Sequence, residues 1–226
     1  MKNLKSIAAG LCAALVLVGC NVSNTAKGTA IGAGGGAALG AIIGKIAGNT
    51  AVGAAIGGVV GAGTGAIIGS KMDRAKKQAE AVKNAQVETI TDANGLEAVK
   101  VTFDSGILFA TNKADLNADS KSSLQQFATV LKDNSDCDIA IFGHTDNTGT
   151  DAINNPLSKK RAQSVSSYLK TQGVASSQIK TVDGQGSTNP VADNSTAEGR
   201  KQNRRVEVYM YASEKMIKEA NAEAAK

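Results

Sequence analysis

Two short runs hold the residues of this chain that are best suited to chemistry. The run GHTDNTG at 143–149 places Asp146 in a polar, glycine-bounded loop, and the run LSKKRA at 157–162 places Arg161 fifteen residues further on. A carboxylate binds an ammonium group, and a guanidinium holds a carboxylate through two parallel hydrogen bonds. With the loop at a strand end and the second run on the next helix, the two side chains would converge on a small ligand that carries both an amine and a carboxylate.

Other kinds of site agree less well with these residues. His144 is the only histidine in the chain, so neither a metal cluster nor a Cys–His nucleophile is indicated. The stretch from Asp146 to Asp151 lacks the spacing and the terminal bidentate Glu of a calcium loop. These two aspartates are also the only acidic pair that suggests an enzyme. The residues alone leave open a plain salt bridge between Asp146 and Arg161.

The first 19 residues are predicted to be a lipoprotein signal peptide. Lys2 and Lys5 form a positive start, and the apolar stretch 7–18 is too short to be a stable membrane span. It ends in LVGC at 17–20, which resembles the bacterial lipobox, so Cys20 would be lipidated and would begin the mature chain. An ordinary secretory signal is the alternative. Asn21 stands where an aspartate commonly retains lipoproteins at an inner membrane, which favours the outer membrane.

Charge and composition exclude some partners. The formal charge of +5 falls to +3 once Lys2 and Lys5 leave with the signal, which is too small to predict nucleic-acid binding. Aromatic residues make up 3% of the chain and tryptophan is absent, so bases have no stacking platform. Cys137 is the one cysteine left after Cys12 is removed and Cys20 is lipidated, so no intramolecular disulfide can form. It begins an apolar strand pattern and is expected to be a small buried hydrophobe.

Residues 28–69 form a low-complexity block with glycine at nearly every fourth position. The glycines fall into two runs, from Gly28 to Gly48 and from Gly53 to Gly69. Fourfold spacing puts them on one face of a helix, where two backbones approach closely. Each helix would be about as long as the ~30 Å thickness of a bilayer's hydrocarbon core. We predict a membrane-associated glycine-zipper hairpin at 28–70; a flexible linker and zipper pairing between chains, which would make a homo-oligomer, are the alternatives.

The remaining residues divide into a linker, a spacer and one soluble domain. Residues 20–27 would be a lipid-anchored linker. Residues 71–86 are rich in Lys, Ala and Gln without Gly or Pro, which predicts a solvated spacer helix. The soluble domain would take 87–212, and a charged, Ala-rich terminal helix would take 213–226.

Hydrophobic periodicity predicts the elements of the soluble domain. Strands are expected at 96–103, 137–142, 178–183 and 205–211, and helices at 116–132 and from Asn155 onward, with Pro156 as the first helical residue. This order predicts an α+β fold, a two-layer α/β sandwich of βαβαββ order preceded by the glycine-zipper helical hairpin.

Four motifs in a fixed order then identify a resemblance. They are FATN at 109–112, GHTDNTG at 143–149, LSKKRA at 157–162 and NRRVEV at 203–208. Residues 97–212 resemble the OmpA-like peptidoglycan-binding domain, which is also found in Pal and MotB proteins. With its lipobox-like run and glycine ladder, the whole chain is similar to glycine-zipper lipoproteins that carry this domain.

The resemblance implies a ligand and a set of site residues. The ligand is the diaminopimelate of the peptidoglycan stem peptide, whose side chain ends in an amine and a carboxylate on one carbon. By motif match, Asp146 and Arg161 are the ligand-binding aspartate and arginine. Asn112 matches a ligand-contacting asparagine, and Arg204 lies in the segment that lines the same groove. One departure is Ala110, where many family members have Asp, so the polar lining on that side of the groove is left open.

Taken together, these features favour binding over catalysis. We expect a non-catalytic lipoprotein in the outer membrane, with its domain facing the periplasm, that tethers this membrane to peptidoglycan without metal, cofactor or nucleic acid. The alternative is a wall-anchored component of a transport, pore or motor assembly. A motor's membrane helix usually carries an ionisable residue, and Lys45 is the only such candidate in the glycine block. An enzyme acting on the same wall is a third hypothesis.

Overall fold

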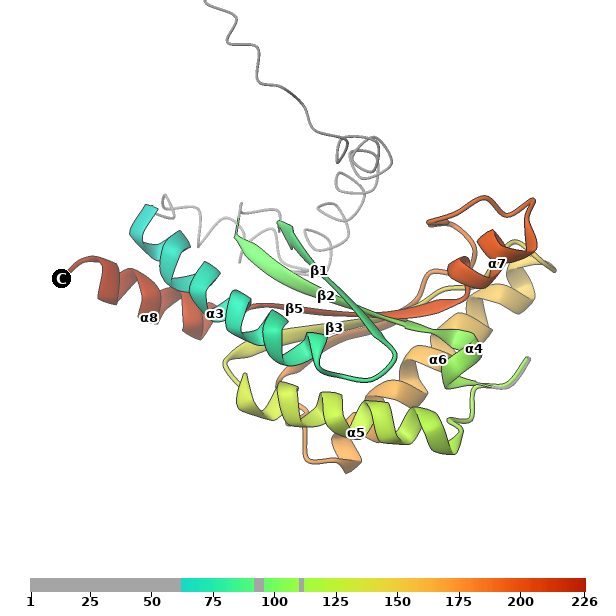
Figure 1. Ribbon diagram of the computed structural model, residues 1–226, viewed down its shortest axis with the longest axis horizontal. Coiled ribbons are helices and arrows are strands. Elements are labelled where there is room, and N and C mark those ends of the chain that lie inside the picture. Colours follow the sequence, from blue (N-terminus) through green and yellow to red (C-terminus); the bar gives the residue numbers. More distant parts are fainter. Residues whose placement is uncertain (1–61, 92–95, 110–111) are drawn as a thin grey trace, which may run out of the picture.

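A computed structural model describes residues 62–91, 96–109 and 112–226 (Figure 1). The strands are β1 (Ala85–Thr91), β2 (Glu97–Asp104), β3 (Cys137–Gly143), β4 (Ile179–Gly184) and β5 (Arg205–Ala212). The helices are α3 (Ala62–Glu80), α4 (Ser105–Leu108), α5 (Ala118–Asp133), α6 (Asp151–Thr171), α7 (Ala197–Asn203) and α8 (Glu214–Ala224). The predicted signal peptide, the lipidation site Cys20 and the zipper glycines before residue 62 lie outside the described residues.

The strands form one mixed sheet in the order β1-β2-β5-β3-β4. β5 lies between β2 and β3 and is antiparallel to both, whereas β3 and β4 run parallel. The carboxyl ends of β2, β3 and β4 and the start of β5 therefore meet at one end of the sheet. Every predicted ligand-binding residue comes from a loop or helix that leaves this end or returns to it.

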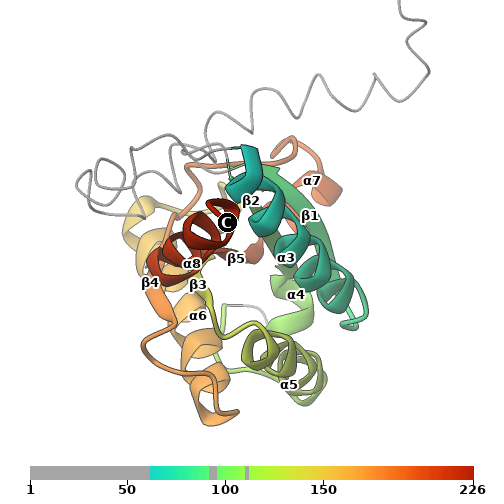
Figure 2. The same ribbon diagram turned by 90° about the vertical axis from the view of Figure 1, so that its left-hand side faces the viewer.

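The main core lies between the sheet and its helices. In Figure 1, α5 and α6 lie below the sheet, and Figure 2 shows α8 beside α3. Alternate residues of the strands face this layer, among them Phe103, whose ring meets that of Phe127 edge to face at 5.5 Å between centroids. The opposite alternation forms a smaller cluster that includes Phe142 and Tyr209. The predicted α+β fold, with helices layered on a sheet, is confirmed.

The four predicted strands agree with β2, β3, β4 and β5 within two residues, and the helices expected at 116–132 and 213–226 agree equally well with α5 and α8. The edge strand β1 and the short helices α4 and α7 were not predicted. Cys137 is buried as expected. The start of α6 was predicted wrongly. The helix begins at Asp151, so Pro156 is its sixth residue rather than its first. A proline there removes one backbone hydrogen bond. The first turn is tied to the preceding loop by Asn154, whose side chain donates to two carbonyls of that loop.

The prediction of a solvated spacer helix at 71–86 was also wrong. Helix α3 runs from Ala62 to Glu80 and packs against β1, β2 and α8, and the residues after it form the edge strand β1. Its buried face has helical spacing and consists of Ile68, Met72, Ala75 and Ala79. The hairpin predicted at 28–70 included Ile68, so its last residues overlap α3 and the apolar face of this helix was not recognised. In the described part of the chain, no helix is long and apolar enough to cross a membrane.

Helix α8 was predicted as a charged terminal helix, and its packing was not foreseen. Met216 and Ile217 are buried in the main core, and Asn221 accepts a hydrogen bond from the Thr64 hydroxyl of α3 at 2.7 Å. The two ends of the described chain therefore pack together, and α3 belongs to the same folded domain as the sheet rather than to a separate spacer.

Two glycines allow α6 to lie unusually close to the ends of β3 and β4. A Cβ added to Gly143 would lie 2.0 Å from the carbonyl oxygen of Ser158, and one added to Gly184 would lie 2.3 Å from the amide nitrogen of Lys159. Backbone atoms of a helix cannot yield to such contacts as a flexible side chain can. These glycines therefore set the distance between α6 and the loop that follows β3.

We predict that Gly143→Ala lowers the free energy of unfolding by about 1–3 kcal/mol, the usual cost of forcing extra volume into a packed site. The matched control is Gly65→Ala in α3, where an added Cβ would meet nothing within 4 Å. The control should be neutral or stabilising by up to about 1 kcal/mol, because alanine is the better helix former. Urea unfolding of both variants measures the difference, and equal effects would contradict the close-packing argument.

Candidate functional site

The loop after β3 presents Asp146 at the end of the sheet. Its Oδ1 accepts a hydrogen bond from the backbone N–H of Thr148 at 2.8 Å, and its Oδ2 accepts one from Nη1 of Arg204 at 2.5 Å. Burial alone would raise the pKa of the Asp146 carboxyl, but the hydrogen bonds from Arg204 and Thr148 hold it below its ordinary value. Asp146 is therefore ionised at neutral pH and is oriented by two donors.

Helix α6 supplies Arg161, which is only 4% exposed. Its Nε donates to the carbonyl of Lys113 at 3.1 Å, and its guanidinium lies 5.2 Å from the centroid of the Phe109 ring. Its buried Nη1 donates to no acceptor in the described part of the chain. Burial, and then the positive charge of Arg204, lower the pKa of Arg161, while Asp146 acts in the opposite direction. The guanidinium stays charged nonetheless, so this group is an incompletely satisfied cation close to Asp146.

The other two predicted site residues lie beside this pair. Arg204 caps the carboxyl end of α7 and reaches Asp146 directly. Asn112 is exposed, has a positive φ of 55°, and directly precedes Lys113, whose carbonyl orients Arg161. Asparagine tolerates this left-handed backbone better than most residues. The structure thus brings Asp146, Arg161 and Arg204 into one electrostatic cluster and sets Asn112 next to it in the chain.

Asn154 was missed as a part of this site. It is buried on the first turn of α6, and its Nδ2 donates to the carbonyl of Thr148 at 3.1 Å and to that of Asp146 at 3.4 Å. The loop bearing Asp146 is thereby fastened to the helix bearing Arg161. The sequence offered a weak signal, because an asparagine near a helix start commonly hydrogen-bonds to backbone.

A buried carboxylate joins the site's two main segments. Glu207 on β5 accepts from Tyr209 Oη at 2.6 Å, from Arg205 Nε at 2.7 Å and from His144 Nε2 at 3.1 Å. His144 stands two residues before Asp146, and Arg205 directly follows Arg204. Burial would raise the pKa of Glu207, but the His144 hydrogen bond and the Arg205 charge hold it well below its usual range. Because the carboxylate can only accept, His144 carries its proton on Nε2.

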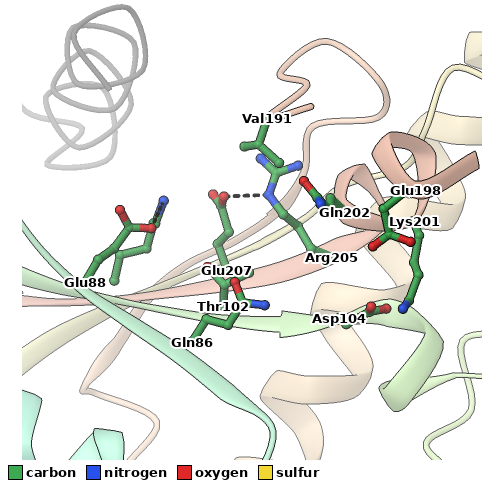
Figure 3. A pocket seen from close by; sticks show the side chains of 11 residues that line it. Gln86, Glu88, Thr102, Asp104, Val191, Glu198, Lys201, Gln202, Arg205 and Glu207 are labelled. Carbon is green, nitrogen blue, oxygen red and sulfur yellow. Dashed lines mark hydrogen bonds and ion pairs between the residues drawn. The ribbon is translucent and has the colours of Figure 1, made fainter. Parts of the chain in front are cut away.

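Arg205 also borders a polar cavity of about 390 Å³ on the sheet face opposite the main core (Figure 3). The figure shows the Arg205–Glu207 hydrogen bond in its wall, with Glu198 and Lys201 of α7 toward one side. Several charges of this cavity already have partners within it: Lys100 pairs with Glu88, and Arg205 with Glu207. The cluster around Asp146 is the better candidate for a ligand site, because the buried Nη1 of Arg161 has no hydrogen-bond acceptor in the part of the chain that the structure describes.

This cluster combines one carboxylate with two guanidiniums, so it suits a small ligand that offers a carboxylate together with an ammonium group. Within residues 62–91, 96–109 and 112–226, no three His, Cys, Asp or Glu side chains are grouped as a metal site would require. A Ser–His or Cys–His pair is also absent from the described hydrogen bonds of His144, whose side-chain partner is Glu207.

Two protein families match this chain. Residues 108–204 match the OmpA family, and residues 1–73 match the YMGG-like Gly-zipper family. The first match contains Asn112, Asp146, Arg161 and Arg204. The second ends within α3, eleven residues past the first described residue of that helix.

Curated relatives match about half of the chain. The peptidoglycan-binding protein ArfA of Mycobacterium tuberculosis is 44% identical over 111 residues, which are 49% of this chain and 34% of ArfA. The outer-membrane lipoprotein YfiB of Pseudomonas aeruginosa is 39% identical over 110 residues, which are 49% of this chain and 65% of YfiB. This chain therefore matches only part of the length of either relative.

A solved structure shares the fold. The cell wall anchor of the T6SS from Pseudomonas aeruginosa superposes with a TM-score of 0.52 at 28% identity, over 63% of this chain and 97% of that chain. Relatives of this chain thus include peptidoglycan-binding proteins and outer-membrane lipoproteins, and the recognised OmpA-like region and glycine zipper are both confirmed by the family matches.

We predict that the domain loses stability as the pH falls below about 6.5, because burial lowers the pKa of His144 from its ordinary value of 6.5, against the opposing effect of Glu207. The unfolded chain then binds a proton that the folded domain does not, which costs up to about 1.4 kcal/mol per pH unit until the folded pKa is passed. Urea unfolding at pH 7.5, 6.5 and 5.5 measures this slope.

His144→Gln is the control for this pH dependence, because glutamine can still donate to Glu207 but does not titrate. His144 is the only histidine of the chain, so the slope between pH 6.5 and 5.5 should flatten in the variant. The pKa values of the Asp146 and Glu207 carboxyls are lowered in the folded domain. Their contribution to stability is present above the ordinary carboxyl pKa and is lost only at lower pH than that of His144. An unchanged slope in the variant would exclude His144 as its source.

Proposed function

Because residues 108–204 of this chain form an OmpA-family domain, we propose that the protein is a non-catalytic lipoprotein that tethers the outer membrane to peptidoglycan. Its domain faces the periplasm and binds the diaminopimelate of the stem peptide. The name of ArfA as a peptidoglycan-binding protein and that of YfiB as an outer-membrane lipoprotein support the two halves of this proposal.

The observation that carries the proposal is the buried, incompletely bonded Arg161 beside an ionised Asp146. Among the described residues, Nη1 of Arg161 is a buried donor without an acceptor, and leaving such a group unpaired is costly. A ligand carboxylate would satisfy it, and Asp146 would receive the ammonium group on the same carbon. Asn112 would contact the ligand from the connection between β2 and α5, and Arg204 would do so from the start of β5.

A binding role is also supported by what the charged groups do. The carboxylate of Glu207 accepts three hydrogen bonds and is 1% exposed, so it is engaged in structure. His144 is equally buried and donates to Glu207. Neither is positioned as a base for water or for a nucleophile. We therefore assign no catalytic residue and require no cofactor.

The likeness to the cell wall anchor of the T6SS favours one other candidate, a wall-anchoring subunit of a larger envelope assembly. Both candidates use the same domain and the same ligand. They differ in whether the chain is isolated from membranes with a fixed set of other envelope proteins, as a subunit would be, or with peptidoglycan alone.

We predict that the full-length lipoprotein, in detergent, sediments with purified peptidoglycan without added metal or nucleotide and releases no soluble wall fragments. Asp146→Ala and Arg161→Ala should each weaken binding tenfold or more, because each loses charged hydrogen bonds worth about 1.5–3 kcal/mol. Arg161→Lys should fail similarly, since lysine keeps the charge but lacks the fork that binds a carboxylate.

Lys159→Ala is the matched control for these variants. Lys159 lies on the same helix, is exposed, and pairs with Asp183 at 3.3 Å, so its loss removes a positive charge without touching the cluster. Thermal unfolding should show that all four variants are folded. The assigned site is wrong if the Asp146 and Arg161 variants sediment as fully as the control.

We predict that Cys20→Ala leaves an unprocessed precursor that takes up no labelled fatty acid, because LVGC at 17–20 supplies the only lipobox-like run before the glycine block. Metabolic labelling and the mass of the purified chain measure lipidation and cleavage. Cys12→Ala is the control, since it lies within the predicted signal and should be processed normally. Label in the Cys20 variant would show that the lipid is attached elsewhere.

A further inference from the structure

The site has one carboxylate for two guanidiniums, and the structure shows how they share it. Asp146, with a side chain only 9% exposed, is paired with Arg204, whose side chain is 38% exposed. Arg161 is bonded to the Lys113 carbonyl and is left with its buried Nη1 unpaired. In this state, the position that a ligand's ammonium group would take at Asp146 is occupied by an internal cation.

The three charged side chains differ in how firmly they are held. Asp146 is fixed by the Thr148 N–H, and Arg161 by the Lys113 carbonyl and the Phe109 ring. Arg204 has a fixed backbone, since its N–H donates to Arg200 O and its carbonyl accepts from Ser105 N–H. Its side chain, however, is held by Asp146 and is substantially exposed. Arg204 can therefore change partners while the backbone of the site stays in place.

Its sequence neighbour shows that this freedom is particular to Arg204. Arg205 donates from Nε to Glu207, from Nη1 to the Asn203 carbonyl and from Nη2 to the Asn189 carbonyl, and it is buried. All three of its nitrogens are engaged in the structure. Successive residues of a strand point to opposite faces, so Arg204 faces the site, whereas Arg205 stabilises the strand from the other face.

We propose that Arg204 is a specificity-determining residue that makes binding of an ammonium group at Asp146 conditional on a carboxylate in the same ligand. This inference rests on the proposed function. A ligand that ends in a plain ammonium, such as a lysine side chain, would displace Arg204 from Asp146 and leave two guanidiniums without an anion. A ligand that ends in an ammonium and a carboxylate takes Asp146 from Arg204, but its carboxylate gives both Arg204 and Arg161 a new acceptor.

The electrostatics of the site support this exchange. Burial, and after it the positive charge of Arg204, lower the pKa of Arg161, so the two guanidiniums repel each other. The negative charge of Asp146 offsets that repulsion. An added ammonium group without a carboxylate would neutralise Asp146 and leave the repulsion between the two guanidiniums uncompensated. The site should therefore bind a zwitterionic ligand more tightly than a purely cationic one.

The test compares two soluble stem peptides that differ in one group. The full-length lipoprotein in detergent is titrated with a diaminopimelate-containing peptide and with the same peptide carrying lysine in its place. The wild-type protein should prefer the first by tenfold or more. Arg204→Gln should bind the lysine peptide at least threefold more tightly than the wild type, while its affinity for the diaminopimelate peptide stays level or falls.

Lys201→Gln is the control for the loss of a positive charge near the site, because Lys201 is exposed on the same short helix and lines the cavity on the other sheet face. It should leave the preference unchanged. NMR titration of the Asp146 carboxyl gives a readout without ligand: its pKa should rise in Arg204→Gln and not in Lys201→Gln.

Failure of this inference is distinguishable from failure of the proposed function. If the wild type binds the diaminopimelate peptide and Arg204→Gln weakens both peptides by the same factor, Arg204 is only a ligand contact and its proposed role is wrong. If the wild type binds neither peptide and does not sediment with peptidoglycan, the proposed function is wrong as well. A higher affinity of Arg204→Gln for the lysine peptide alone supports the partner exchange.

Discussion

The geometry of the site depends on the hydrogen bonds that the buried carboxylate of Glu207 accepts. It accepts hydrogen bonds from His144 at the end of β3 and from Arg205 at the start of β5, and the backbone N–H of His144 donates to the Arg205 carbonyl beside it. Removing one partner from such a buried network would leave the others unsatisfied. These bonds thereby fix the distance between the segment that bears Asp146 and the segment that bears Arg204.

A second constraint sets the position of α6, which bears Arg161. Gly143 and Gly184 let its backbone approach the ends of β3 and β4 within distances that no side chain would allow. Asn154 then bonds this helix to the loop that bears Asp146. The loop that bears the anion is therefore fixed relative to the helix that bears the buried cation, which reduces the entropy lost when a ligand is bound.

The packing of α3 changes how the membrane-proximal part of the chain must connect to this domain. A solvated spacer at 71–86 would have separated a lipid-anchored segment from the domain by about 24 Å of helix. Instead, α3 buries Met72 and Ala75 in the main core, and Lys71 pairs with Asp136 at 2.8 Å. Helix α3, from Ala62 onward, belongs to the folded domain, so the proposed tether has less free chain between membrane and wall than the composition suggested.

The sequence by itself determined the order of most strands and helices, and it singled out Asp146 and Arg161. Those inferences depend on contiguous residues: alternating apolar residues at 205–211, helical spacing in 116–132, and motifs at turns. The start of α6 was missed because the bonds from the Asn154 side chain to the loop six and eight residues before it were not recognised. The burial of α3 was missed because Ile68 packs against elements far away in the chain.

Only the tertiary structure decided which charges meet. Arg204 lies 58 positions from Asp146, and Glu207 lies 63 positions from His144. These pairs form because β5, near the end of the chain, is placed between β2 and β3. No local pattern encodes that strand order or the side to which each of two adjacent arginines points once the strand is paired. The residue types of the site were therefore readable from the sequence, whereas their partners depended on the packed sheet.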